Sequence, residues 1–344
     1  MVRHRPVRIS HRGLTICRLD MGNSPANTSR VKSRLPARSL LLAAVLIGAV
    51  TVRPQQSAAP PQMPEPQLHL TPAEIKIYQR AKTLVNWNSG QIHNSPFLEN
   101  LRLARDQGQL PMILERVGQT ATRLFHDFPQ IACDEEVVSE KRSGTSSVTE
   151  RHNFRYIVIP RSAGAVPAFY EYRTELNGNP LDAFSPGGGT MITSNYASTW
   201  LYLSPADQHD SHFRYFGTQT IRSRECHVVG FAQDPESFHR AGKLIFGDQS
   251  IAVLVQGLAW IDSQTFQLLR IKIWLLAPRT DVGLRSHDST VDFYPVQPSG
   301  SEKVLWLPRD VTVQTGYLGL WLRNTHHCSN FQLFRVESTI KTGK

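Results

Sequence analysis

Beyond Pro129 the chain repeats one pattern: short segments in which apolar and polar residues alternate, separated by turn residues. Alternation with a period of two is typical of β-strands. About ten such segments run to the end of the chain, and most are joined by short turns, of which Asn177-Gly178-Asn179-Pro180 gives the clearest signal. Short turns join antiparallel neighbours, whereas parallel strands need a crossover of roughly a dozen or more residues. The pattern therefore predicts a mainly antiparallel β domain over residues 131–344.

A sheet of about ten strands does not stay flat, because strand twist accumulates across it. Such a sheet either closes into a barrel or wraps around something apolar. We therefore predict an α+β fold whose main part is a curved open sheet, or half-barrel. The expected strands are 131–141, 148–160, 169–176, 212–221, 225–232, 252–261, 266–276, 285–294, 303–315 and 320–341. Residues 192–203, in an insertion over 181–210, could form a short amphipathic helix or a bent strand, and we predict the helix.

Residues 71–130 have a helical period and precede the β domain. Thr71-Pro72-Ala73-Glu74 begins the first helix, because its first residue is a good N-cap and its last stands at the capping-box position. Ser95-Pro96 indicates a second start, and a third helix is expected over 110–126. A free-standing helical domain of this size would be marginal, so we expect this region to pack on the sheet as an N-terminal cap.

Residues 1–59 are predicted to be a leader. They carry ten basic residues and one acidic residue, and the apolar run Leu40–Val50 is too short, at roughly 16 Å of helix, for a bilayer core of roughly 30 Å. A basic flank followed by a short apolar run is typical of a secretion signal. Met21 would begin a signal of more usual length, which makes residues 1–20 a candidate for an over-extended start. Residues 60–70 are a Pro-rich linker.

The leader predicts a protein that is exported to the periplasm or the extracellular space, with membrane contact only through an uncleaved signal or a ligand. The leader also explains the formal charge of +10, because residues 60–344 carry 28 basic and 27 acidic residues. A nearly neutral body lacks the clustered cations that neutralise phosphates, so we expect no nucleic-acid partner. The sequence does not indicate an oligomeric state.

Three cysteines remain beyond the leader: Cys133, Cys226 and Cys328. In an oxidising compartment two of them could pair, in any of three combinations. Three separate buried thiols are an equally good interpretation. Their wide spacing has none of the close pairs that a zinc knuckle needs.

The hairpin formed by 252–261 and 266–276 carries bulky apolar residues on both faces. A sheet whose two faces are both apolar is covered on both sides. One cover is expected to be the helical cap, and the other is either the opposite wall of a barrel or a ligand. The side chains that we predict for a ligand-binding cavity wall are Trp260, Trp274, Leu258 and Phe231.

This hairpin resembles a known one. Gln256–Asp262 with Leu268–Ile271 resembles the G-x-x-W-I-D … L-x-R-I hairpin of bacterial lipoprotein-sorting (Lol-type) carriers, and Leu307-Pro308-Arg309-Asp310-Val311 resembles their L-P-R-x-V strand start. Together with 213–217 and 229–233, the pattern is similar to that of uncharacterised secreted bacterial proteins that share this fold. The resemblance implies a half-barrel that helices close over an apolar cavity. In the carriers such a cavity holds lipoprotein acyl chains, which implies a lipid or an acylated protein as partner here.

The densest group of potential metal ligands is Asp207, His209, Asp210 and His212. Imidazole and carboxylate at this spacing could hold zinc or another divalent ion, although a solvated loop explains the same residues. Two carboxylate pairs, Glu135 with Glu136 and Glu171 with Glu175, are expected to be solvated on half-exposed strands. There is no nucleophile elbow and no H-E-x-x-H motif, so we predict no catalytic residue and no cofactor.

The leading hypothesis is an exported, non-enzymatic protein that binds a hydrophobic ligand or a lipidated partner in a β cavity. One alternative is a periplasmic hydrolase or metal-dependent enzyme that uses the 205–212 loop. Another is a structural or interaction domain whose core is filled and which takes no ligand.

Overall fold

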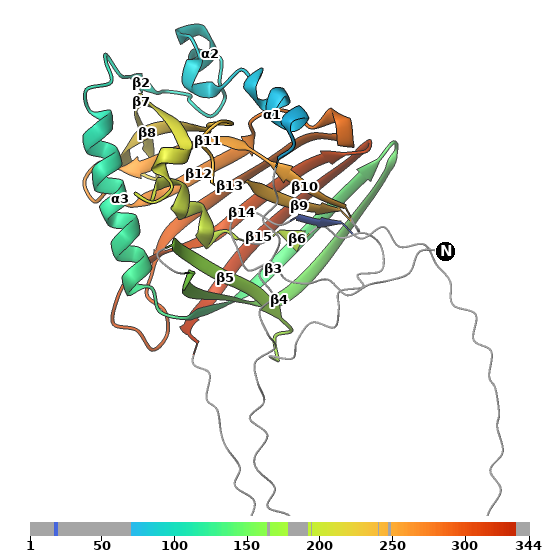
Figure 1. Ribbon diagram of the computed structural model, residues 1–344. Helices are drawn as coiled ribbons and strands as arrows, with labels where there is room; N and C mark the ends of the chain where they lie inside the picture. Colours follow the sequence, from blue (N-terminus) through green and yellow to red (C-terminus); the bar gives the residue numbers. More distant parts are fainter. Residues whose placement is uncertain are drawn as a thin grey trace, which may run out of the picture.

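One large, curved, open antiparallel sheet dominates the computed structural model (Figure 1), which describes residues 17–19, 70–163, 166–177, 192–193, 195–239, 241–246 and 249–334. Eleven strands pair in the order β2-β7-β8-β11-β12-β13-β14-β15-β3-β4-β5. Every strand pair in this sheet is antiparallel. The predicted fold class, a curved half-barrel with helices in front of it, is confirmed.

Apart from β2, which lies in the region predicted to be helical, the strands of the large sheet follow the predicted segments closely. Most neighbours in the sheet are also neighbours in the chain, as short turns require. The main exception is β15, which returns to pair with β3, so that the last strand lies beside the first long one. The strands are β2 (Arg102–Leu103), β3 (Ile131–Ser143), β4 (Ser146–Ala163), β5 (Val166–Thr174), β7 (Ser211–Ile221), β8 (Arg224–Gln233), β11 (Val255–Asp262), β12 (Leu268–Leu275), β13 (Leu284–Val296), β14 (Leu305–Tyr317) and β15 (Leu320–Leu333).

A second, four-stranded sheet was not predicted. Its order is β10 (Gln249–Val253), β9 (Gly242–Phe246), β1 (Cys17–Leu19) and β6 (Ile192–Thr193). The predicted strand 252–261 is therefore two strands, which part at Leu254: β10 pairs with β9, whereas β11 pairs with β8 and β12. The run from Ile251 to Leu254 is uniformly apolar and holds no turn residue, so its sequence gives no sign of the break.

The first and third predicted helices are confirmed as α1 (Pro72–Gln79), which has the expected capping box, and α3 (Leu110–Asp127). The second prediction was wrong, because α2 (Ser89–His93) ends before Ser95. Asn88 caps it, and Gln91 completes the capping box. Between 192 and 203 the helix is confined to a 3-10 segment, and the 3-10 segments are η1 (Leu84–Asn86), η2 (Ala197–Leu203), η3 (Gln208–Asp210) and η4 (Thr280–Val282).

We call inner the face of the large sheet that packs on α3 and η2, and outer the face that lies under residues 84–101. The inner face is covered along its length, and the outer face is covered where β7, β8, β11 and β12 lie. The inner face holds the largest apolar cluster. Every strand of the large sheet except β2 contributes to it, together with Trp200 and its neighbours in η2. On the outer face Leu84 of η1 lies over Gly230, where a Cβ atom would come within 2.3 Å of its Cδ1 atom. Glycine at this position therefore lets the cap lie close against the sheet.

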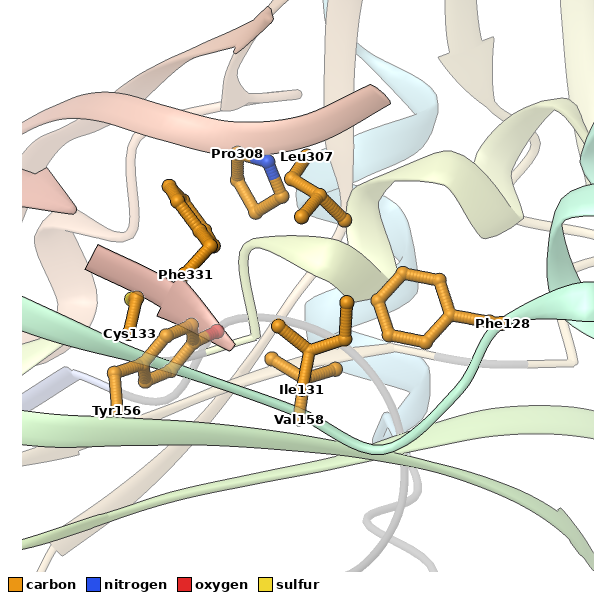
Figure 2. A pocket seen from close by; sticks show the side chains of 8 residues that line it. All are labelled: Phe128, Ile131, Cys133, Tyr156, Val158, Leu307, Pro308 and Phe331. Carbon is orange, nitrogen blue, oxygen red and sulfur yellow. The ribbon is translucent and has the colours of Figure 1, made fainter. Parts of the chain in front are cut away.

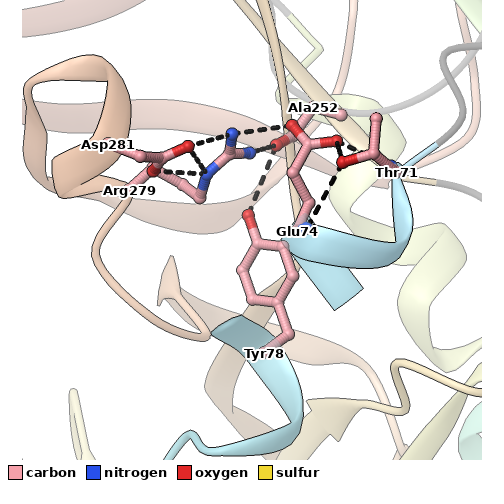
Figure 3. A network of polar contacts seen from close by, with 6 residues as sticks. All are labelled: Thr71, Glu74, Tyr78, Ala252, Arg279 and Asp281. Carbon is pink, nitrogen blue, oxygen red and sulfur yellow. Dashed lines mark hydrogen bonds and ion pairs between the residues drawn. The ribbon is translucent and has the colours of Figure 1, made fainter. Parts of the chain in front are cut away.

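A buried arginine fastens α1 to the sheet (Figure 3). Arg279, only 2% exposed, donates to Glu74 Oε1 at 2.6 Å, to Ala252 O at 2.9 Å and to Asp281 Oδ2 at 2.8 Å. The hydroxyl of Tyr78 also donates to Ala252 O, at 3.3 Å. One guanidinium therefore joins the start of α1, the end of β10 and η4.

We expect Arg279→Met to lower the free energy of unfolding by about 2–3 kcal/mol, because it removes hydrogen bonds from a charged donor and leaves Ala252 O with a weaker partner. Amide hydrogen exchange in α1 should accelerate more than exchange in β12 or β13. Denaturant unfolding and hydrogen exchange measure both effects. Arg80→Met, at the exposed end of the same helix, should stay within about 0.5 kcal/mol of the wild type. An equal loss in the two variants would contradict the fastening role.

Candidate functional site

A small apolar hollow opens on the inner face, where α3 ends (Figure 2). Its free volume is about 10 Å³, enough for about one water molecule, whereas pockets for drug-sized ligands hold roughly 300–1,000 Å³. A larger ligand would therefore have to move the lining side chains apart. Eight side chains line it: Phe128, Ile131, Cys133, Tyr156, Val158, Leu307, Pro308 and Phe331.

Local sequence features explain why a hollow forms here. Pro129 cannot continue α3, and Phe128 leaves the helix in an extended conformation and packs edge-on against Phe169, 5.0 Å between ring centroids. The pairing of β15 with β3 shifts register after Ser329, which turns Phe331 toward the hollow (Figure 2). Because α3 ends here and β15 has a bulge, the apolar side chains that line the hollow have no close partners on one side.

A buried ring of hydrogen bonds lies beside the hollow and joins β3, β5, β15 and the residue before η2. Arg173 Nη2 donates to Glu135 Oε1 at 2.7 Å and to the Tyr196 hydroxyl at 3.3 Å. Tyr196 lies 2.9 Å from His326 Nε2, and His326 Nδ1 lies 2.9 Å from Glu135 Oε1. Burial lowers the pKa of His326, so its imidazole is neutral. The Nδ1–H of His326 then donates to Glu135, and its Nε2 accepts from the Tyr196 hydroxyl.

Two carboxylates in this region are fully buried, and their environments differ. Burial raises the pKa of Glu135, but the Arg173 guanidinium and the His326 hydrogen bond outweigh it and bring the pKa down to about 2. Burial raises the pKa of Glu171 above its usual value, although Tyr156 and Ser198 donate to it. Because the Tyr156 hydroxyl is engaged with Glu171, only the apolar part of that ring faces the hollow.

The expectation that Glu135 and Glu171 are solvated was therefore wrong. Neighbours on a strand face opposite sides, so Glu136 faces outward to Arg151 while Glu135 faces the core. The sequence signal for the burial of Glu135 was the apolar character of the residues two positions before and two positions after it. Glu135 lies between Cys133 and Val137 in this alternation, and both of these are buried.

A buried histidine of β13 gives the fold a pH dependence. Burial lowers the pKa of His287 to about 4, and its Nδ1 lies 2.9 Å from Thr315 Oγ1. The unfolded chain binds this proton more readily than the native state does. The stability that His287 contributes is therefore complete above about pH 6.5 and is lost as the pH falls towards 4. The lowered pKa of His326 acts in the same direction.

We expect the wild type to lose on the order of 2 kcal/mol through His287 between pH 7 and pH 4.5. In His287→Gln this part of the loss should vanish, because glutamine does not titrate. Denaturant unfolding of both proteins at the two pH values measures the difference. Parallel losses in the two proteins would contradict the assignment.

The four residues predicted for a cavity wall do not share one face. Phe231 pairs with Gly257, so it points to the inner face, where it packs on Tyr202, 5.0 Å between ring centroids. The other three point to the outer face under the helical cap, where Trp274 stacks on Trp87 and the remaining two are buried: Trp260 and Leu258. Contact of any of these side chains with a ligand stays a prediction.

The predicted metal group separates into three parts. Asp207 accepts from Ser204 Oγ at 3.1 Å, and His212 Nε2 lies 3.5 Å from Asp234 Oδ2. His209 and Asp210 stay together and are joined by His239, which the sequence analysis missed because it lies in a loop 30 residues further along the chain. In the described part of the chain these three are the residues whose ligand atoms meet within 4.8 Å.

Among the described residues Cys133, Cys226 and Cys328 are free and buried, and the Cys133 and Cys328 thiols are neighbours. Cys226 belongs to the outer cluster, whereas Cys133 and Cys328 belong to the inner one. Burial and the neighbouring Cys133 thiol raise the pKa of Cys328 well above its usual value. Such a protonated, enclosed thiol is a poor nucleophile.

No helix in the described residues has the length and apolar character needed to cross a membrane. No family model matches the chain, and no curated protein matches it either. Among solved structures, a DUF1329 family protein from Desulfovibrio piger is similar at 13% identity and a TM-score of 0.35, over 65% of this chain and 95% of that one. A putative outer membrane lipoprotein-sorting protein domain from Vibrio parahaemolyticus is similar at 11% identity and a TM-score of 0.36, over 67% and 93%.

Proposed function

We propose that the protein is a non-enzymatic binding protein that takes up the end of one acyl chain, or a similar apolar group, at the hollow at the end of α3, whose lining side chains move apart to admit it. The observation that carries this proposal is the lining. All eight side chains around an open hollow present apolar or aromatic surface, and they come from the end of α3 and from β3, β4, β14 and β15. An apolar surface left open to water favours an apolar occupant.

The size of the hollow limits the ligand to a chain end. Trp200, Leu201, Tyr202 and Leu203 of η2 are buried against the inner face and fill most of the space that a half-barrel would otherwise enclose. The free space that is left there is about 10 Å³, so a chain end has to displace lining side chains as it enters. Several acyl chains side by side would not fit beside η2.

Affinity should therefore grow with chain length until the hollow is full. Burying one methylene group contributes about 0.8 kcal/mol, which is about a fourfold change in Kd. A series of fatty acids of increasing length should follow this slope and then level off. Displacement of an environment-sensitive apolar dye gives the Kd of each fatty acid.

A filled hollow should bind nothing. Val158→Phe places a larger side chain in the hollow and is expected to weaken fatty-acid binding at least roughly tenfold, because several methylene contacts are lost. Val148→Phe is the matched control, since it makes the same change on the same strand at a side chain that is 51% exposed. Equal binding by the two variants would contradict the proposed site.

The filled inner face favours one rival, a structural or interaction domain that takes no ligand. Under that function the wild type binds neither the dye nor a fatty acid of any length. The chain-length series therefore separates the two functions.

We also propose that the protein is exported. The predicted leader and linker lie outside the described residues, apart from Cys17–Leu19 and Leu70. Cell fractionation after expression in a secreting host tests export, and mass spectrometry of the N-terminus tests cleavage. A chain found only in the cytoplasmic fraction would contradict export.

A further inference from the structure

His209, Asp210 and His239 form a compact group of potential metal ligands away from the hollow. His209 Nε2 lies 3.0 Å from His239 Nδ1 and 3.1 Å from Asp210 Oδ1, and His239 Nδ1 lies 2.6 Å from the same carboxylate oxygen. The two rings meet edge to face, 4.6 Å between centroids. Two imidazole nitrogens and one carboxylate oxygen therefore converge on one point.

The backbone around this group is held in place. The Asp210 side chain is only 5% exposed, and its second oxygen accepts the His239 backbone N–H at 2.9 Å. Asp234 N donates to Asp210 O at 2.9 Å, which ties the loop after β8 to η3. On the other side Gln208 of η3 donates to Leu114 O of α3 at 2.9 Å. Anchored ligands of this kind lose little conformational entropy on binding an ion.

The donor set selects the class of ion. Each neutral imidazole carries one N–H, so the two rings bring at most two protons to three close contacts, and no placement of these protons satisfies all three. A cation between the three atoms, with the protons on the other ring nitrogens, does satisfy them. Imidazole with one carboxylate suits zinc and similar transition metals rather than magnesium or calcium. Ligands around tetrahedral zinc stand ~3.3 Å apart, given bonds of about 2.0–2.1 Å, so small side-chain movements would suffice.

The exposure of the group leaves room for a further ligand. The His209 and His239 side chains are 55% and 67% exposed, so water can complete the coordination of an ion held by the three residues. We propose that His209, Asp210 and His239 bind one divalent transition metal ion, zinc being the representative, and that the ion fastens the loop 234–239 to η3. This site is separate from the apolar hollow and does not depend on it.

The test is a calorimetric titration of the full chain, without an affinity tag and stripped of metal, with zinc alone. We expect one zinc ion per chain. His209→Ala and His239→Ala should each weaken binding at least roughly tenfold, because each removes one of three protein ligands. His212→Ala is the matched control, since this histidine is 68% exposed, lies close by in the chain and faces Asp234 instead. Its affinity should stay within about twofold of the wild type.

Two further readouts make the result decisive. The absorption spectrum of bound cobalt should indicate nitrogen and oxygen ligands and should change in His239→Ala. Amide exchange over 234–239 should slow when zinc is added. Circular dichroism in chelator should be the same for all variants, because the replaced side chains are exposed. The absence of zinc binding, or equal weakening in His212→Ala, would overturn the site, and zinc binding without protection of the loop would overturn its fastening role.

Discussion

Replacing Arg173 with methionine is expected to lower the free energy of unfolding by about 3–5 kcal/mol, because it leaves the Glu135 carboxylate buried without its cation. Glu135 is fully buried and Arg173 is 5% exposed in this pair. The Tyr196 hydroxyl would lose a donor as well, so the ring of hydrogen bonds that joins η2 to β3 and β5 would open. Denaturant unfolding at pH 7 measures the loss.

An exposed ion pair between β3 and its other partner in this region, β4, supplies the control. Arg151 Nη1 and Glu136 Oε1 are 2.5 Å apart, and their side chains are 69% and 47% exposed. Arg151→Met should cost about 0–1 kcal/mol, because water screens this pair. The double variant Glu135→Leu with Arg173→Met should be more stable than Arg173→Met alone, since it removes the stranded charge. A loss in Arg173→Met as small as that in Arg151→Met would contradict the role of the ring.

Replacing Trp200 with alanine is expected to cost about 3–5 kcal/mol and to open a cavity inside the half-barrel. Trp200 is among the largest fully buried side chains, and its ring packs edge-on against Phe293, 5.7 Å between centroids. A small apolar molecule that fills the new cavity should restore part of the loss, because it replaces the missing contacts. Thermal melting with and without a saturating apolar compound measures both effects.

Trp321→Ala provides the comparison. Trp321 is half-buried on β15. The Arg142 guanidinium lies over its ring, with Arg142 Cζ 4.7 Å from the ring centroid. We expect a loss of about 1–2 kcal/mol and no recovery with an apolar compound, because no enclosed cavity forms there. If the two tryptophan variants respond alike to the compound, η2 is not what fills the half-barrel.

The sheet could be predicted from the sequence because its signals are local. Period-two alternation and turn residues define each strand within its own segment, as the β3–β4 hairpin demonstrates. The helix starts at Thr71 and at residue 110 also carry local signals. The break at Leu254 has no such signal, because it lies in a uniformly apolar run. The true start of α2 has a weaker one, which is Asn88 as the N-cap.

The candidate sites could not be predicted in full, because they depend on which distant residues meet. Alternation places Phe231 and Trp260 on opposite faces only once the register of β8 with β11 is known. His239 joins His209 only because the loop after β8 folds back on η3. The small size of the hollow likewise follows from η2, whose position against the sheet no periodicity records.

Native mass spectrometry of the gently purified protein tests the central claim most directly. The account predicts a population whose mass is increased by one acyl-bearing molecule, and this population should be absent in Val158→Phe and retained in Val148→Phe. A wild type with no added mass, which also takes up no fatty acid when one is supplied, would contradict it.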